Sequence, residues 1–111
     1  MKEFRCLTEA TTLYRLAKKQ KLKAFMRDQL LRASSSVALN LAEGNARRTQ
    51  KDRLRFFNIA LASLRETQMI CRLEDLKELE KQANKLGGMI YVLNQNLTDT
   101  VTGTETGPGS Q

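Results

Sequence analysis

The residues of this chain best suited to chemistry are lysines and arginines gathered in two runs. Between Arg15 and Arg27 there are six basic residues and no acidic one, and between Arg47 and Arg55 there are five basic residues beside Asp52. The 111-residue chain carries a formal net charge of +7. Such side chains bind phosphates by displacing the counterions condensed on a nucleic-acid backbone. We therefore expect binding of RNA or DNA through backbone phosphates. The candidate contacts are Lys18, Lys19, Lys21, Lys23 and Arg27 in one run and Arg47, Arg48, Lys51, Arg53 and Arg55 in the other.

A simpler explanation of the same charges is that they keep the helix faces of a small protein soluble. The alternative function is then a protein–protein adaptor whose helix faces dock a partner. The aromatic residues do not favour recognition of individual bases. Only Phe56 is expected to be exposed, as a platform on which a base could stack. The other phenylalanines, Phe4, Phe25 and Phe57, are expected in the core. Recognition of backbone or shape is therefore the expected mode.

The sequence lacks the residues and motifs that most often carry out catalysis. The chain contains no histidine, which is the usual general base near neutral pH. It also lacks a glycine-rich phosphate loop and the spacing of a metal site. We expect no enzyme activity, no cofactor and no metal. The two cysteines, Cys6 and Cys71, are too few for a disulfide framework and are expected at opposite ends of two parallel helices, too far apart to bridge.

Four helical segments must position the basic residues. Apolar spacing predicts helices over about 2–18, 22–46, 49–72 and 75–98. Gly44 and Asn45 are expected to end the second helix, and Asp75 is expected to cap the fourth in a capping box with Glu78. Short connections predict an all-α, up-down-up-down antiparallel four-helix bundle over residues 1–98. A three-helix bundle with a long bent second helix is the alternative. Residues 99–111 are polar and are predicted to form a disordered tail.

Small residues inside the helices suggest close helix contacts. The run Ser34–Ser36 has no accompanying base and is interpreted as a site where another helix approaches. Gly87 and Gly88 interrupt the most regular apolar stripe, at about 1 kcal/mol each relative to alanine. Contact with a neighbouring helix is the most economical reason for tolerating that loss.

A membrane location is not expected. No apolar run approaches the roughly 20 residues that span a bilayer, and the first ten residues lack the apolar segment of a secretory signal. The expected compartment is the cytoplasm.

Polar residues occur within or beside the apolar stripes of the second and third helices. Asn40, Glu43 and Arg47 share one helix face, and Glu43 precedes Arg47 by four residues, the favourable order for an ion pair. Two interpretations have equal weight. The first is an internal network that sets helix register, with Glu43 hydrogen-bonded across the bundle, and the second is a subunit interface or a ligand-facing surface. The candidate structural and assembly residues are Asn40, Glu43, Gly44, Ser63 and Glu66.

The stretch from Gln29 to Gln68 resembles the S23 family, the proteins encoded in intervening sequences of bacterial 23S ribosomal RNA genes. That family includes relatives of the accessory variability determinant of diversity-generating retroelements. The matching residues are Gln29, Leu30, Arg32, Ala33, Ser36, Val37, Asn40, Leu41, Ala42, Glu43, Gly44, Arg48, Phe57, Ile59, Ala60, Ser63, Leu64 and Glu66. Ala38 departs from the family's proline, and Ala62 departs from its glycine.

The resemblance implies a non-enzymatic, basic four-helix bundle that assembles as a ring-like homopentamer. For the retroelement relatives it implies binding to nucleic acid and to a reverse transcriptase, as an accessory factor in cDNA synthesis.

Overall fold

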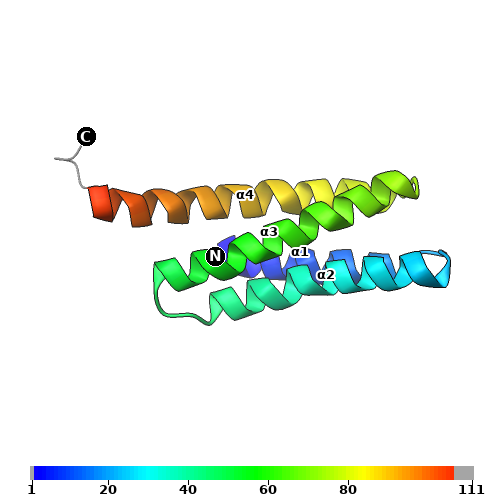
Figure 1. The fold of residues 1–111 in the computed structure, drawn as a ribbon, viewed down its shortest axis with the longest axis horizontal. Coiled ribbons are helices and arrows are strands. Elements are labelled where there is room, and N and C mark those ends of the chain that lie inside the picture. Colours follow the sequence, from blue (N-terminus) through cyan, green and yellow to red (C-terminus); the bar gives the residue numbers. More distant parts are fainter. Residues whose placement is uncertain (1, 107–111) are drawn as a thin grey trace.

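The computed structural model describes residues 2–106, with side chains over residues 4–101, as four α-helices (Figure 1). The helices are α1 (Lys2–Lys18), α2 (Ala24–Asn45), α3 (Gln50–Leu73) and α4 (Lys77–Thr106). No strand occurs among residues 2–106. The predicted all-α four-helix architecture is confirmed, and the three-helix alternative with a long bent second helix is wrong because non-helical connections separate all four helices.

The four helices form a closed ring of pairwise contacts. Each helix packs on the next along the chain, and α4 returns to pack on α1, with the α2–α3 contact the most extensive. Successive helices run in opposite directions (Figure 1), because their connections span only residues 19–23, 46–49 and 74–76. The bundle therefore has the predicted up-down-up-down order, and its α1–α2 and α2–α3 turns lie at opposite ends.

The core follows the predicted apolar stripe of the fourth helix closely. That stripe is the one interrupted by Gly87 and Gly88; Leu79, Ala83, Leu86, Ile90, Leu93 and Leu97 are all buried, and Leu76, its predicted first member, packs partly buried against the core. The other three helices bury Cys6, Ala10, Leu13, Ala17, Leu30, Ala33, Val37, Leu41, Phe57, Ala60, Leu64, Ile70 and Cys71. Removal of this apolar surface from water is the main favourable contribution to folding. Both cysteines are buried and neither is in a disulfide, and burial raises the pKa of the Cys71 thiol to about 11.

Two of the three phenylalanines expected in the core lie on the surface. Phe4 is 65% exposed and Phe25 is 71% exposed, whereas Phe57 is fully buried. Phe4 lies two residues before the buried Cys6, and two residues correspond to about 200° around a helix. Met26, four residues before Leu30, packs against the core in place of Phe25. The helices were predicted correctly, but the inward face of two of them was assigned partly to the wrong aromatic residues.

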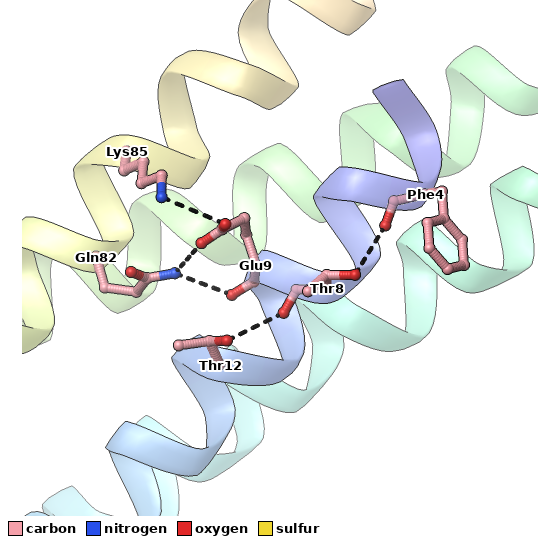
Figure 2. A network of polar contacts seen from close by, with 6 residues as sticks. All are labelled: Phe4, Thr8, Glu9, Thr12, Gln82 and Lys85. Carbon is pink, nitrogen blue, oxygen red and sulfur yellow. Dashed lines mark hydrogen bonds and ion pairs between the residues drawn. The ribbon is translucent and has the colours of Figure 1, made fainter. Parts of the chain in front are cut away.

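A polar contact joins the first and last helices (Figure 2). Gln82 Nε2 donates to the Glu9 carboxylate at 2.7 Å and to the Glu9 backbone carbonyl at 3.1 Å. Lys85 Nζ lies 3.3 Å from the other carboxylate oxygen. The hydrogen bond from Gln82, assisted by Lys85, lowers the pKa of Glu9 against the opposing effect of burial. The contact therefore favours the ionised carboxylate and ties α1 to α4.

The fourth helix is longer than predicted. It continues to Thr106, eight residues past the bundle boundary predicted at residue 98. Within this extension the Thr100 hydroxyl donates to the Asn96 carbonyl at 2.9 Å, which supplements the backbone hydrogen bonds of the helix. The last part of the predicted tail, residues 107–111, lies outside the described residues.

Asp75 ends α3 and does not cap α4, so the predicted capping box is wrong. Its φ angle is 58°, in the left-handed region. The Leu76 N–H donates to the Cys71 carbonyl at 2.8 Å, and the Glu74 N–H donates to the Ile70 carbonyl at 2.9 Å. A left-handed residue followed by this longer hydrogen bond is the Schellman motif that closes helix C-termini. Asp75 occupies the position in that motif where glycine is preferred.

Replacing Asp75 should test this assignment through stability. A left-handed conformation costs a non-glycine residue about 1–2 kcal/mol. We expect Asp75→Gly to raise the free energy of unfolding by about 0.5–1 kcal/mol and Asp75→Ala to lower it. Urea unfolding followed by circular dichroism measures both. The control is Glu74→Gly, at a φ of −104°, which should lose stability; a gain there equal to that of Asp75→Gly would contradict the assignment.

Candidate nucleic-acid interface

The first basic cluster surrounds the α1–α2 turn. Four of its five residues, Lys18, Lys19, Lys21 and Lys23, are exposed. Arg27 is half-buried and donates from Nη1 to the carbonyls of Lys18 and Gln20, both at 3.0 Å. Lys18 is the last residue of α1, where carbonyls lack partners within the helix, and Gln20 lies in the connection that follows. Arg27 therefore organises the turn, while the four lysines present charge to solvent.

The second basic cluster surrounds the α2–α3 turn and is built on the same plan. Arg53 is half-buried and donates from Nη2 to Asn45 Oδ1 at 3.3 Å, which links the two helix ends. Thr49 caps α3, since its hydroxyl accepts the Asp52 N–H at 3.1 Å. Arg48 and Lys51 are exposed on either side of this cap. Here too one arginine shapes the turn and its neighbours remain at the surface.

Two arginines of the second cluster share one aromatic ring. The guanidinium carbon of Arg47 lies 4.7 Å from the centroid of the Phe56 ring, and that of Arg55 lies 4.5 Å from it. Phe56 was expected to be an exposed stacking platform, but it is half-buried and carries these two cations. Arg47 also forms an ion pair with Glu43, whose side chain is 50% exposed. The sequence signal for this arrangement was only the nearness of Phe56 to the basic run.

The two clusters are separate surfaces. They lie at the two ends of α2 (Figure 1), whose 22 residues span about 33 Å at 1.5 Å per residue. An acidic residue, Glu74, lines the same surface depression as Lys21, Lys23 and Arg27. The structure therefore does not unite the ten predicted residues in one site, and the field of the first cluster is reduced by a nearby carboxylate.

Asn40 and Ser63 belong to a polar seam between α2 and α3. The hydroxyls of Ser36 and Ser63 are 2.8 Å apart. Asn40 Nδ2 donates to the Ser36 carbonyl at 2.8 Å and to its hydroxyl at 3.1 Å. These half-buried groups fix which residue of α2 lies beside which residue of α3. The predicted register-setting network is confirmed for these two residues.

Glu43 and Glu66 do not take part in that network. Both are exposed, and Glu43 pairs with Arg47 along its own helix, so the predicted hydrogen bond across the bundle is wrong. Each glutamate lies two residues after a buried leucine, Leu41 or Leu64, which is about 200° around the helix. Both carboxylates therefore point away from the core.

Gly44 allows α2 and α3 to approach each other closely. A Cβ atom at this position would lie 2.6 Å from Phe57 Cε1 and 3.1 Å from Phe56 Cβ. Gly87 has the same role on α4, where a Cβ would lie 3.3 Å from Leu64 Cδ2 and 3.2 Å from Gln68 Nε2. Gly88 faces open space. The expected small-residue contact is therefore confirmed at Gly87 and wrong at Gly88.

A protein-family model described as "23S rRNA-intervening sequence protein" matches residues 4–93. The chain belongs to this family. The matched range contains both basic clusters, the polar seam and the close contact at Gly44. Relative to the pattern of the 23S rRNA-intervening sequence proteins, Ala38 replaces a proline, and α2 runs through this position without interruption.

One solved structure shares the fold. It is the crystal structure of a protein of unknown function from the S23 ribosomal protein family of Bacteroides thetaiotaomicron VPI-5482. The two chains are 24% identical over 90% of this chain and 94% of the other, with a TM-score of 0.53. No curated protein matches the chain.

The part of the chain that the structure describes contains neither a membrane-spanning helix nor a metal-ligand cluster. No helix there is long and apolar enough to cross a membrane. Within the same residues no group of cysteine, aspartate and glutamate side chains is arranged to hold a metal ion.

The contact at Gly44 predicts opposite effects for two glycine substitutions. Gly44→Ala forces a methyl group against the Phe57 ring, and overpacking of this kind costs about 1–3 kcal/mol, offset in part by the better helix propensity of alanine. We expect a net loss of about 1–2 kcal/mol in the free energy of unfolding. Gly88→Ala meets no neighbour and should gain up to about 1 kcal/mol. Thermal and urea unfolding measure both, and equal gains at the two positions would refute the close-contact role of Gly44.

Proposed function

We propose that this 23S rRNA-intervening sequence protein is a non-enzymatic, cytoplasmic protein that binds the phosphate backbone of RNA or DNA. The observation that carries the proposal is the pair of exposed basic clusters at the two ends of a bundle whose net charge is +7. Each lysine or arginine that neutralises a phosphate releases condensed counterions, which supplies sequence-independent affinity.

The structure refines which residues would make these contacts. Arg27 and Arg53 are half-buried and hold their turns. The remaining eight predicted residues are exposed at the two ends of the bundle, where a nucleic acid could reach them. They are Lys18, Lys19, Lys21, Lys23, Arg47, Arg48, Lys51 and Arg55. Backbone contact needs no ordered array of aromatic residues, which agrees with the small aromatic content of the chain.

Assembly of several copies is the second part of the proposal, and an apolar outer face supports it. On α3, Ile59, Met69 and Leu73 are 41%, 51% and 64% exposed. On α2, Leu39 and Phe25 are 69% and 71% exposed. On α3, Ile59 and Met69 are ten residues apart and Met69 and Leu73 are four apart, and on α2 Phe25 and Leu39 are fourteen apart. These separations are close to whole numbers of turns at 3.6 residues per turn, so the residues of each set lie on one side of their helix.

The register of α2 against α3 joins the two sets into one face. Because Ser36 lies beside Ser63 in an antiparallel pair, Leu39 lies nearly level with Ile59. By the same count Arg32 lies nearly level with Glu66, in the middle of the face. Exposed apolar surface of this kind is typical of an interaction site. A homo-oligomer would cover it, and the family resemblance makes this a pentamer.

A protein partner is the third part. The likeness to retroelement accessory proteins extends the proposal to a reverse transcriptase bound beside the nucleic acid. The adaptor alternative draws on the same α2–α3 outer face, since a face of this kind accepts a different protein as readily as a second copy.

Binding to nucleic acid should depend on salt and on the two clusters. We expect the affinity for a labelled single-stranded RNA to fall steeply between about 50 and 200 mM salt. The double variants Lys21→Glu/Lys23→Glu and Arg48→Glu/Lys51→Glu should each weaken binding and flatten the salt slope by about 1.4, since each single-strand phosphate contact contributes about 0.7. Fluorescence anisotropy measures both quantities.

The charge-matched control for that titration is Lys77→Glu/Lys81→Glu, at two exposed positions on the first turns of α4. It should change affinity far less than either cluster variant. Affinity that does not respond to salt, or that falls equally in all three variants, would contradict the proposal and favour the adaptor.

Assembly should depend on the outer face of α2 and α3. We expect the wild-type chain to sediment as a multiple of its 12.6 kDa mass. Leu39→Glu should shift it to monomers, because it buries an unpaired charge in the interface. Tyr91→Glu, at a 55% exposed position on α4, should leave the oligomer intact. A monomeric wild type would refute the assembly proposal without bearing on nucleic-acid binding.

A further inference from the structure

The α2–α3 cluster contains two positive charges that are held together. Arg47 and Arg55 lie over the ring of Phe56, at 4.7 and 4.5 Å from its centroid. Phe56 is itself held in place, since it is half-buried beside the tight Gly44 contact. The ring therefore positions both guanidinium groups at the surface of the turn.

We propose that Arg47, Phe56 and Arg55 form a preorganised clamp for the phosphate groups of a nucleic-acid strand, and that Glu43 competes with those phosphates for Arg47. This inference rests on the proposed nucleic-acid binding. It goes further by making an uncharged residue, Phe56, and an acidic residue, Glu43, determinants of the affinity.

The stacked arrangement suits a phosphate ligand. A guanidinium group that lies over an aromatic ring keeps its N–H donors in its own plane, where they can form paired hydrogen bonds to phosphate oxygens. The face of the ring attracts both cations, so the two side chains do not have to be ordered when the ligand binds. Two like charges near one ring also repel each other, and a bound anion reduces that repulsion. Phe56 is thus a positioning residue that acts through the two arginines.

Glu43 adds a competing anion to the same clamp. Its carboxylate accepts a hydrogen bond from Arg47 Nη2, and the Arg47 side chain is 39% exposed. The ion pair lies at the surface, where such pairs contribute little to stability. A phosphate group could therefore replace the Glu43 carboxylate as the partner of Arg47 with little loss of stability. Among the described side chains Arg55 forms no ion pair of this kind, although Asp52 lies three residues before it on α3.

The first test distinguishes the contribution of the Phe56 ring to the affinity from that of the positive charges. We expect Phe56→Leu to weaken binding of a single-stranded oligouridylate of about 20 nucleotides by about 3- to 10-fold, because two cation–π contacts are lost. The salt slope should stay the same, since the number of cations does not change. Phe56→Trp retains an aromatic face and should keep the wild-type affinity. Circular dichroism and thermal unfolding of each variant check that the bundle is intact.

Charge-conserving variants of the arginines provide an independent route if Phe56→Leu fails to fold. Arg47→Lys and Arg55→Lys keep the net charge at surface positions but remove the planar donor group. Each should weaken binding by a similar factor. Arg48→Lys is the matched control, because no ring contact involves that residue among the described side chains, and it should change affinity less than twofold.

The second test concerns Glu43, and here the substitution is expected to increase the affinity for the oligonucleotide. Glu43→Gln frees Arg47 and should tighten binding by about 3- to 10-fold. Glu78→Gln removes the same charge from an exposed position at the start of α4, at the other end of the bundle, and should have a smaller effect. Equal gains from the two variants would mean that Glu43 acts only through net charge.

The outcomes distinguish this inference from the proposed function. Absence of any salt-sensitive binding by the wild type would overturn the proposed function, and the clamp with it. Binding that is lost on charge reversal of Arg48 and Lys51 but is equal in Phe56→Leu, Phe56→Trp and wild type would overturn the clamp alone. Weaker binding in Phe56→Leu, recovery in Phe56→Trp and tighter binding in Glu43→Gln together would establish it.

Discussion

The close approach of α2 and α3 is the constraint on which the other features of this bundle depend. At Gly44 the two backbones come so near that a methyl group would collide with the Phe57 ring. This lets Phe57, the largest fully buried side chain among the described residues, fill the core from α3. Three half-buried polar residues, Ser36, Asn40 and Ser63, then set the register along the rest of the pair. Dense packing of this kind has few alternative arrangements. The α2–α3 pair therefore fixes the position of the turn between the two helices and of the side chains on it.

The packing of α2 against α3 determines the geometry of the turn that joins them. Because α2 and α3 are close at Gly44, the turn that follows is short, and residues on either side of it meet: Arg47 from the end of α2 reaches the ring of Phe56 on α3. Arg53 completes the turn by bonding to Asn45. At the opposite end of the bundle, Arg27 has the same role: it donates to the last carbonyl of α1, that of Lys18, and to the Gln20 carbonyl in the connection. A half-buried arginine with several donors can satisfy groups that a helix end leaves open, so these two arginines serve the fold and their neighbours remain exposed.

Sequence patterns predicted the helices correctly, but they predicted the orientation and role of individual side chains less well. The spacing of leucine and alanine identified all four helices, and the α4 stripe was correct at each buried position from Leu79 to Leu97. The wrong assignments concern residues whose position depends on one helix rotation or one backbone angle. Phe4 and Phe25 are hydrophobic but lie on outward faces, since an α-helix turns by about 100° per residue and two neighbouring stripes are easily confused. Asp75 fits both a helix start and a helix end, and only its positive φ angle decides between them.

The sequence alone determined the all-α class, the number and order of the helices, the basic character of both turns and the family, because each follows from composition, periodicity or a local motif. Only the tertiary structure decided which polar residues face inward, which arginines shape a turn and which present charge, and why Gly44 is needed. These are properties of side chains from different helices that come together in space. Glu43 illustrates the difference: its pairing with Arg47 was readable from a spacing of four residues, whereas its exposure followed from how α2 is rotated against α3.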